Sequence, residues 1–321
     1  MLKVLVAGAI HEAGRALLDA RDDVDVEALG RLSVADLEAR IADLDALVLR
    51  LTPVRAGTIA RARRLKVVSR FGVGYDNVDV DALTRHGIPL AIVGDANAVP
   101  VAEHALALIL ALTRRLIAHD HAVHVGDYGV RDGAAQSELW RKTVLVVGFG
   151  RVGRRVARRC AAFDMHVVAA DPYLARESVE TEGYRYVDDF RAALGEADIV
   201  TLHLPATPDG RPVMGRREFE AMKPGGYFIN VARGSLVDED ALADALSRGR
   251  LRGAGLDVTR QEPPARDSPL LRLSNVILTP HCAALTEECA RRMSVVSVQN
   301  ALDGLDGRLK PELVVNKEVL G

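Results

Sequence analysis

The chain has 321 residues, of which 49% are hydrophobic and only 4% aromatic, and its 42 Lys and Arg residues nearly balance 44 Asp and Glu residues. Balanced charge without blocks of one sign argues against nucleic acid or an acidic membrane surface as a partner. The length fits two domains of roughly 150 residues each, and the composition is typical of an α/β enzyme packed with small aliphatic side chains.

The cysteines and the apolar runs bear on the cellular compartment. Cys160, Cys282 and Cys289 are an odd number without metal-ligand spacing, which favours reduced packing residues and predicts no metal site. The N-terminus runs directly into a strand-like segment rather than a signal peptide. The longest apolar stretch, residues 105–113, is too short to span a bilayer. We therefore expect a cytoplasmic protein that does not enter a membrane.

Short β-branched runs alternate with helix-like segments along the whole chain, a pattern that predicts βαβ units and parallel sheets. Five strands are expected before residue 96, at residues 2–8, 24–29, 46–51, 66–73 and 88–93. Seven more are expected at residues 143–147, 165–171, 184–188, 199–204, 227–231, 253–258 and 276–279. Because this exceeds one ordinary doubly wound sheet, the sequence predicts two α/β domains with parallel sheets of the Rossmann or flavodoxin type.

The segment between the two sets of strands suggests how the domains are connected. Residues 102–117 show an apolar-rich helical pattern, whereas residues 119–139 are polar, contain glycine and predict a loop or an extended arm. A last helical pattern at residues 287–302 can pack back onto the first domain. We therefore expect a nucleotide-binding domain, residues 97–288, inserted into a discontinuous substrate-binding domain made of residues 1–96 and 289–321.

A glycine motif that follows the strand pattern at residues 143–147 is the strongest single signal. In Gly-x-Gly-x-x-Gly, two glycines let the backbone turn tightly and approach a pyrophosphate, and the third lets the next helix pack on the strand. The phosphates then sit at the N-terminus of that helix, where free N–H groups favour negative charge. The predicted cofactor-binding residues of this segment are Gly148, Gly150, Arg151, Val152 and Gly153.

Asp171, at the end of the next strand pattern, bears on which dinucleotide binds. A carboxylate there can accept hydrogen bonds from the adenosine ribose and repels a 2′-phosphate. The sequence therefore predicts NAD. Arg176 lies near enough in the chain to keep NADP as the less favoured alternative.

Three chemistry-bearing residues follow different strands of the second set: Arg233, Glu262 and His281. Parallel sheets bind ligands at the carboxyl ends of their strands, so these side chains are candidates for one site. Oxidation of an alcohol by hydride transfer needs a base such as imidazole, a carboxylate that supports its charge, and a guanidinium that binds a substrate carboxylate. Taken singly, each residue also fits a role without catalysis: Arg233 as a solvated charge, Glu262 as a loop residue and His281 as a packing residue.

The motifs around these residues resemble the D-isomer-specific 2-hydroxyacid dehydrogenase family over nearly the whole chain. The segments that carry the resemblance are residues 72–79, Asn97 with residues 101–104, the glycine motif, residues 197–205, residues 222–234, Asp257 with residues 262–264, and residues 279–281.

The resemblance implies hydride transfer between nicotinamide and C2 of a D-2-hydroxy acid or 2-keto acid, of the phosphoglycerate, glycerate (hydroxypyruvate) or lactate type, with Arg233, Glu262 and His281 as the catalytic set. The implied cofactor contacts beyond the glycine motif are His203, Pro205, Ala232 and Asp257, the last at the nicotinamide carboxamide. The implied substrate contacts are Arg50, the backbone amides of Val73 and Gly74, Asn97, and Arg233. The resemblance also implies a homodimer to which residues 102–117 and 119–139 contribute.

Departures from the family pattern leave the substrate open. Phosphoglycerate dehydrogenases have an Arg-Ser pair in the loop that here reads Leu49-Arg50-Leu51-Thr52-Pro53. Arg50 matches but Leu51 replaces the serine, so the loop fits either a phosphate or an uncharged substrate tail. The chain ends soon after residues 314–316, so we expect a short form without the regulatory domain of long phosphoglycerate dehydrogenases.

Two other functions are compatible with the same scaffold. An NAD(H)-sensing corepressor is the alternative, because such proteins resemble the family even at the catalytic positions and a fold does not determine a function. Formate dehydrogenases share the scaffold but have Gln at the position of Glu262, which argues against that activity.

Overall fold

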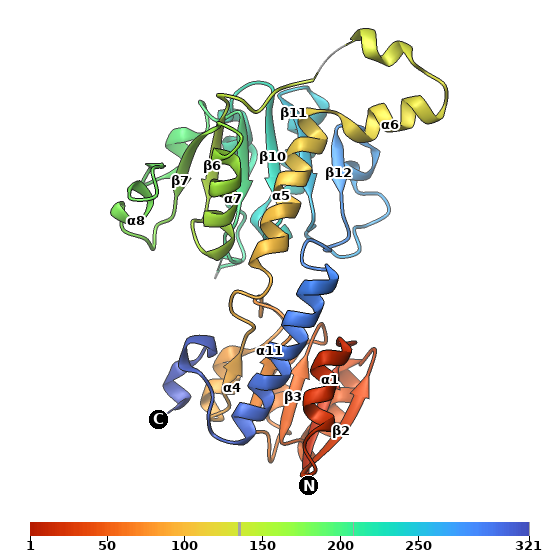
Figure 1. The fold of residues 1–321 in the computed structure, drawn as a ribbon, viewed down its shortest axis with the longest axis vertical. Helices are drawn as coiled ribbons and strands as arrows, with labels where there is room; N and C mark the ends of the chain where they lie inside the picture. Colours follow the sequence, from red (N-terminus) through yellow and green to blue (C-terminus); the bar gives the residue numbers. More distant parts are fainter. Residues whose placement is uncertain (134–135, 208, 321) are drawn as a thin grey trace. The chain divides into compact units, whose positions relative to one another are not determined.

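The structure is a computed structural model that describes residues 1–133, 136–207 and 209–320. The chain divides into two compact units, one formed by Met1–Asn97 with Ala284–Gly321 and the other by Ala98–Ala283. Each unit has its own parallel β-sheet, so the expected class of two parallel-sheet α/β domains is confirmed (Figure 1). The expected second boundary, between residues 288 and 289, lies inside the helix that begins at Glu287.

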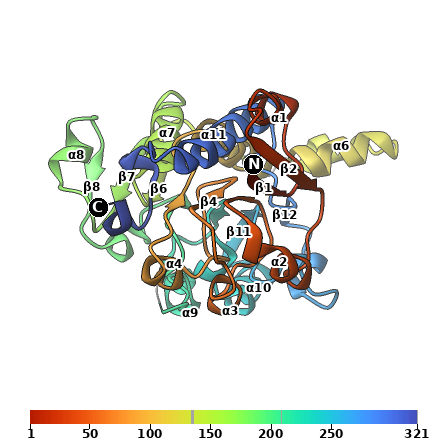
Figure 2. The same cartoon turned by 90° about the horizontal axis from the view of Figure 1, so that it is seen from below.

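The first unit contains a five-stranded sheet in the order β2-β1-β3-β4-β5. Its strands are β1 (Leu2–Ala7), β2 (Val24–Leu29), β3 (Ala46–Leu49), β4 (Val67–Arg70) and β5 (Leu90–Ala91). Its helices are α1 (Glu12–Asp19), α2 (Val34–Arg40), α3 (Ala56–Ile59), α4 (Val80–Arg85) and α11 (Glu287–Leu305). Alternate residues of the strands point to opposite faces, so each face carries its own apolar core. Helices α2 to α4 cover one face, and α1 and α11 cover the other (Figure 2).

Helix α11 belongs to the first unit although it comes almost 200 residues after β5 in the chain. Gly304 permits a close approach, because a Cβ atom there would lie 2.6 Å from the Cβ atom of Val67 on β4. The buried hydroxyl of Ser69 donates a 2.6 Å hydrogen bond to the carbonyl oxygen of Ser297. These contacts make residues after Ala283 an integral part of this sheet's core.

The second unit contains a seven-stranded parallel sheet in the order β12-β11-β10-β9-β6-β7-β8. Its strands are β6 (Thr143–Val147), β7 (His166–Ala170), β8 (Arg185–Tyr186), β9 (Ile199–Leu202), β10 (Gly226–Asn230), β11 (Leu251–Leu256) and β12 (Val276–Leu278). Its helices include α5 (Ala98–Thr113), α6 (Leu116–His124), α7 (Arg151–Ala161), α8 (Glu177–Glu180), α9 (Arg216–Ala221) and α10 (Glu239–Ser247). The strand order reverses between β6 and β9, which is where such sheets bind nucleotides.

Helix α5 accounts for the apolar pattern near residue 110. It packs on β10, β11 and α7 of its own unit, with Leu108 and Leu112 against the glycines of β11. The expectation of a loop or extended arm over residues 119–139 is wrong at its start, because α6 continues to His124. Arg115 has a φ of 52°, so the two residues Arg114 and Arg115 are enough to end α5 and turn the chain into α6. In the described part of the chain, no helix has both the length and the apolar character needed to cross a membrane.

Candidate active site

Three neighbouring strands of the second unit deliver the proposed catalytic residues to one edge of its sheet. β10, β11 and β12 lie side by side and run parallel, so their carboxyl ends are adjacent. Arg233 follows β10, Asp257 follows β11 directly, and His281 comes shortly after β12. The sheet order therefore gathers side chains that are far apart in the chain.

His281 and Glu262 form a hydrogen-bonded pair. The Nδ1 atom of His281 lies 2.7 Å from Oε2 of Glu262, and both side chains are about half exposed. The hydrogen bond that His281 donates to Glu262 raises the pKa of His281 and outweighs its partial burial, and the charges of Glu262 and Asp257 act in the same direction. Burial would raise the pKa of Glu262, but the hydrogen bond and charge of His281 lower it. The pair therefore favours the protonated imidazole more than a histidine without this partner would.

Arg233 is positioned by the backbone that follows β10. The buried Asn230 accepts a 3.0 Å hydrogen bond from the Ala232 amide and donates one of 2.8 Å to the Arg233 carbonyl oxygen. The guanidinium donates a 2.6 Å hydrogen bond to the Ala232 carbonyl oxygen. Its positive charge lowers the pKa of both Glu262 and His281, which means that the three side chains share one electrostatic environment.

Asp257 is buried, and its side chain contacts the turn that follows His281. Its carboxylate accepts hydrogen bonds from the Thr279 hydroxyl at 2.6 Å and from the amides of Cys282 and Ala283 at 2.9 Å each. The Nε2 atom of His104 on α5 lies 2.9 Å from the Thr279 hydroxyl. The sequence does not predict a role for His104 or Thr279, because their contact joins residues 175 positions apart and leaves no local pattern.

The ligand-type atoms of His104, Asp257 and Cys282 lie within 4.8 Å of one another. Metals bind cysteine as the thiolate, but burial and then the charge of Asp257 raise the pKa of the Cys282 thiol. The Asp257 carboxylate is also engaged by three protein donors. These features favour a hydrogen-bonded network at this position over a metal centre.

The glycine motif has the geometry that a pyrophosphate requires. Gly148 has a φ of 93°, and a Cβ atom on Gly153 would lie 1.9 Å from the Gly148 carbonyl oxygen. Apart from Gly150 and its two chain neighbours, none of the described residues has an atom within 4 Å of the position that a Cβ atom would take on Gly150. Helix α7 begins at Arg151, with Gly150 as an N-cap that has no side chain to occupy the first N–H groups. The turn is therefore an open cradle of donors that fits the phosphates of a dinucleotide.

Asp171 is held rigidly at the end of β7. Its carboxylate accepts a 2.8 Å hydrogen bond from the Phe149 amide and one of 3.0 Å from the Tyr173 amide. Each oxygen keeps a further lone pair for a ribose hydroxyl. Arg176 is engaged elsewhere, since it pairs with Glu180 and Asp188 and lies over the Tyr186 ring. The local charge near the end of β7 therefore suits a ribose better than a phosphate.

His203 follows β9, next to the glycine turn. Burial lowers the pKa of His203 to about 3, so the ring is neutral at physiological pH. One ring nitrogen, Nε2, lies 3.0 Å from the Thr201 hydroxyl, while Nδ1 is buried and has no hydrogen-bond partner within the described residues. A Cβ atom on Gly148 would lie 2.6 Å from the His203 carbonyl oxygen. An orphaned polar atom beside the turn, with Pro205 two residues further on and Ala232 after β10, fits a bound cofactor.

Apart from Arg233, the expected substrate contacts belong to the first unit. Arg50 follows β3, Val73 and Gly74 follow β4, and Asn97 comes after β5, so they share the carboxyl edge of the five-stranded sheet. The Arg50 guanidinium lies over the Phe71 ring, 5.4 Å from its centroid. Leu51, beside it, is 74% exposed.

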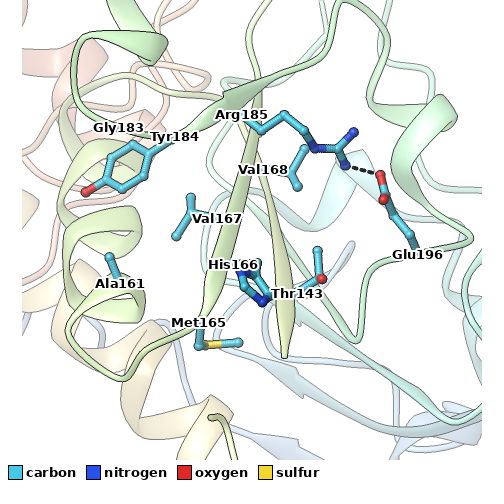
Figure 3. Close-up of a pocket in the computed structure, with 10 residues that line it drawn as sticks. All are labelled: Thr143, Ala161, Met165, His166, Val167, Val168, Gly183, Tyr184, Arg185 and Glu196. Atoms are coloured by element: carbon cyan, nitrogen blue, oxygen red, sulfur yellow. Dashed lines mark hydrogen bonds and ion pairs between the residues drawn. The ribbon is translucent and has the colours of Figure 1, made fainter. Parts of the chain in front are cut away.

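A cavity of about 490 Å³ opens at the opposite edge of the seven-stranded sheet. Figure 3 shows Thr143 and His166, which begin β6 and β7, and the ion pair between Arg185 and Glu196 among its lining residues. None of the predicted site residues lines it. Because doubly wound sheets bind nucleotides at the carboxyl ends of their strands, this cavity is separate from the candidate active site.

Comparison with known proteins agrees with the geometry of the second unit. A family model described as the NAD binding domain of D-isomer specific 2-hydroxyacid dehydrogenase matches residues 106–283. The chain is 39% identical over 315 residues to the D-3-phosphoglycerate dehydrogenase of Methanocaldococcus jannaschii, covering 98% of this chain and 59% of that protein. The chain spans about 60% of the length of the curated relatives it matches.

Two solved structures are similar along almost the whole chain. The D-lactate dehydrogenase from Aquifex aeolicus complexed with NAD and lactic acid has a TM-score of 0.87 at 29% identity, covering 95% of this chain and 96% of that one. The NADPH-dependent glyoxylate/hydroxypyruvate reductase from Sinorhizobium meliloti, in complex with NADP and malonate, has a TM-score of 0.83 at 30% identity, covering 94% and 93%.

Proposed function

We propose, from the premise that this chain belongs to the D-isomer specific 2-hydroxyacid dehydrogenase family, that it transfers a hydride between nicotinamide and C2 of a D-2-hydroxy acid or its 2-keto acid. The observation that carries the proposal is the His281–Glu262 hydrogen bond at the carboxyl edge of a sheet that also bears the glycine turn. The relatives named above are dehydrogenases and a reductase, so they lend no support to a sensor without catalysis.

The hydrogen bond to Glu262 determines which nitrogen of His281 does the chemistry. Glu262 is ionised and can only accept, so Nδ1 of His281 carries a proton and Nε2 is left for the substrate oxygen. In the oxidation direction, neutral His281 takes the hydroxyl proton at Nε2, and in the reduction direction it returns that proton to the carbonyl oxygen. Nicotinamide, when bound, accepts or supplies the hydride.

The remaining groups orient the substrate. We assign Arg233 to the substrate carboxylate and carbonyl oxygen, since a guanidinium can bind the one by two parallel hydrogen bonds and polarise the other. The amides of Val73 and Gly74, with Asn97, are assigned to the carboxylate as well. Arg50 is assigned to the substrate tail, where its charge favours a phosphate and the exposed Leu51 favours an uncharged chain.

The proposed cofactor is NAD. Its support is the Asp171 carboxylate, fixed by two backbone amides, and the engagement of Arg176 with Glu180 and Asp188. The proposed contacts of the dinucleotide are Gly148, Gly150, Arg151, Val152, Gly153, Asp171, His203, Pro205, Ala232 and Asp257. Solved relatives bind either NAD or NADP, so the preference of this chain depends on its own residues.

We further propose a homodimer formed through α6. Of its side chains only Ala122 is buried, while Leu116, Ile117 and Val123 are 55%, 58% and 47% exposed. Figure 1 shows α6 extending away from the sheet of its unit. Ile117→Glu should give a monomer by light scattering at micromolar concentration, whereas Leu271→Glu, at an exposed apolar position outside α6, should not. Monomeric wild-type protein would contradict this assignment.

A cytoplasmic location is proposed on the free thiols of Cys160, Cys282 and Cys289, which suit a reducing compartment. Fractionation of the source cells tests it.

The function is tested by oxidation of NADH and NADPH at 340 nm with a panel of 2-keto acids. The panel contains glyoxylate, hydroxypyruvate, pyruvate, phosphohydroxypyruvate and a branched 2-keto acid. Turnover with any of them supports the dehydrogenase, and the ranking identifies the substrate tail. Tight NADH binding without turnover on the whole panel would favour the sensor instead.

A further inference from the structure

The backbone at His281 adopts an unfavourable conformation that other interactions must stabilise. His281 has a φ of 51°, in the left-handed region that residues other than glycine rarely adopt. Its amide donates a 2.8 Å hydrogen bond to the Asp257 carbonyl oxygen. The next two amides, of Cys282 and Ala283, donate to the Asp257 carboxylate. Asp257 therefore holds the turn through both its main chain and its side chain.

The Asp257 carboxylate is in turn oriented by Thr279, which contacts His104. A carboxylate accepts, so the Thr279 hydroxyl donates its only proton to Asp257 across 2.6 Å. The Thr279 oxygen can then only accept from His104, whose Nε2 lies 2.9 Å away and must carry a proton. The hydrogen bonds run in one direction, from His104 through Thr279 to Asp257.

The position of His104 is fixed by the packing of α5 on β11. It lies on α5 one turn before Leu108, and residues four apart share a helix face. A Cβ atom on Gly255 of β11 would lie 3.0 Å from the Leu108 Cβ atom, so the helix and the strand pack closely. Asp257 follows that strand directly. Helix α5 thus holds the His104 ring nitrogen in a fixed position next to the Thr279 hydroxyl.

We propose that His104 is a positioning residue for His281: it orients the Asp257 carboxylate through Thr279, and this carboxylate holds the left-handed turn in which His281 lies. The inference rests on the proposed function for its catalytic consequence. The network itself can be measured without any substrate.

The first test measures amide hydrogen exchange by NMR in the protein without cofactor or substrate. His104→Leu introduces an apolar side chain of similar size that has no donor, and exchange at the Cys282 and Ala283 amides should become about 10-fold faster. His104→Gln, which supplies an amide N–H, should restore most of the protection. Thr279→Val, which removes only the hydroxyl, should match His104→Leu. Unchanged exchange at these two amides in His104→Leu would overturn the inference.

The second test is a double-mutant cycle on turnover with the best keto acid of the panel. His104→Leu and Thr279→Val should each lower kcat about 10-fold and show no further loss when combined. His166→Leu, at an exposed histidine at the other edge of the sheet, should leave kcat unchanged. Additive losses would show that the two residues act independently and overturn the inference. If the wild type turns over no keto acid, the proposed function fails, while the exchange result still decides the network.

Discussion

A Cβ atom on Gly234 would lie 2.0 Å from the carbonyl carbon of Thr259. Gly234 directly follows Arg233, and the Thr259 amide donates a 3.3 Å hydrogen bond to the Glu262 carboxylate. The loops that carry the proposed guanidinium and the proposed carboxylate therefore touch backbone to backbone. This close approach, which only glycine permits, holds the spacing between the two side chains.

Gly234→Ala should consequently separate the two loops. We expect kcat/KM for the keto acid to fall about 100-fold, because a displacement of about 1 Å in a catalytic site has an effect of this size. Steady-state kinetics and the melting temperature measure the result. Gly57→Ala is the matched control and should leave kcat/KM unchanged, because no other part of the described chain beyond its own helix backbone and chain neighbours comes within 4 Å of the Gly57 Cβ position. Wild-type kinetics in Gly234→Ala would show that the contact does not set the site's geometry.

His281→Asn should abolish most of the turnover and spare cofactor binding. Removal of a general acid and base lowers kcat by about 10²- to 10⁴-fold. The glycine turn and Asp171 lie on other strands, so the NADH dissociation constant measured by fluorescence should change little. Loss of turnover and NADH binding together would count against the role assigned to His281.

Glu262→Gln should shift the pH profile in a defined direction. The hydrogen bond that His281 donates to Glu262 is the main reason that the pKa of His281 lies above its ordinary value of 6.5. Reduction needs protonated His281, so kcat/KM should be high at low pH and fall as pH rises through this raised pKa. Without the carboxylate the pKa drops, and the fall should begin at lower pH. An unshifted profile would mean that the ionisation belongs to another group.

Asp171→Ser should weaken the preference for NADH. The serine hydroxyl can accept one of the two amide hydrogen bonds, but the charge that repels a 2′-phosphate is gone. We expect the ratio of kcat/KM for NADH to that for NADPH to fall about 10-fold or more. The melting temperature serves as a control for the buried position. A constant ratio would place the discrimination elsewhere.

The strands could be predicted because parallel strands covered on both faces are continuous apolar runs. Thr143–Val147 is such a run and begins and ends where expected. Val24–Leu29, an edge strand in which apolar and acidic residues alternate at the start, also begins and ends where expected. The strand expected over residues 66–73 stops at Arg70, because Gly72 has a φ of 146° and turns the chain away. Strand ends depend on such backbone geometry, which residue type alone does not determine.

The break between α5 and α6 could not be predicted, because arginine carries no preference for the left-handed region that Arg115 occupies. In the candidate site, too, some features could be predicted from the sequence and others could not. Motifs identify Arg233, Glu262 and His281 one by one, but their proximity follows from the order β12-β11-β10 in the sheet. The contact of His104 with Thr279 depends on how α5 packs and is visible only in three dimensions.

The insertion of one unit into the other has a consequence for synthesis on the ribosome. Residues 98–283 are contiguous, so the unit with the glycine turn has its whole core as soon as this segment has emerged. The core of the first unit is complete only after α11 has been synthesised, because α11 covers Val4, Val48 and Val67. Until then α1 alone covers that face of the sheet, and the apolar side chains that α11 would cover are open to aggregation. The N-terminal strands are therefore made first but completed last.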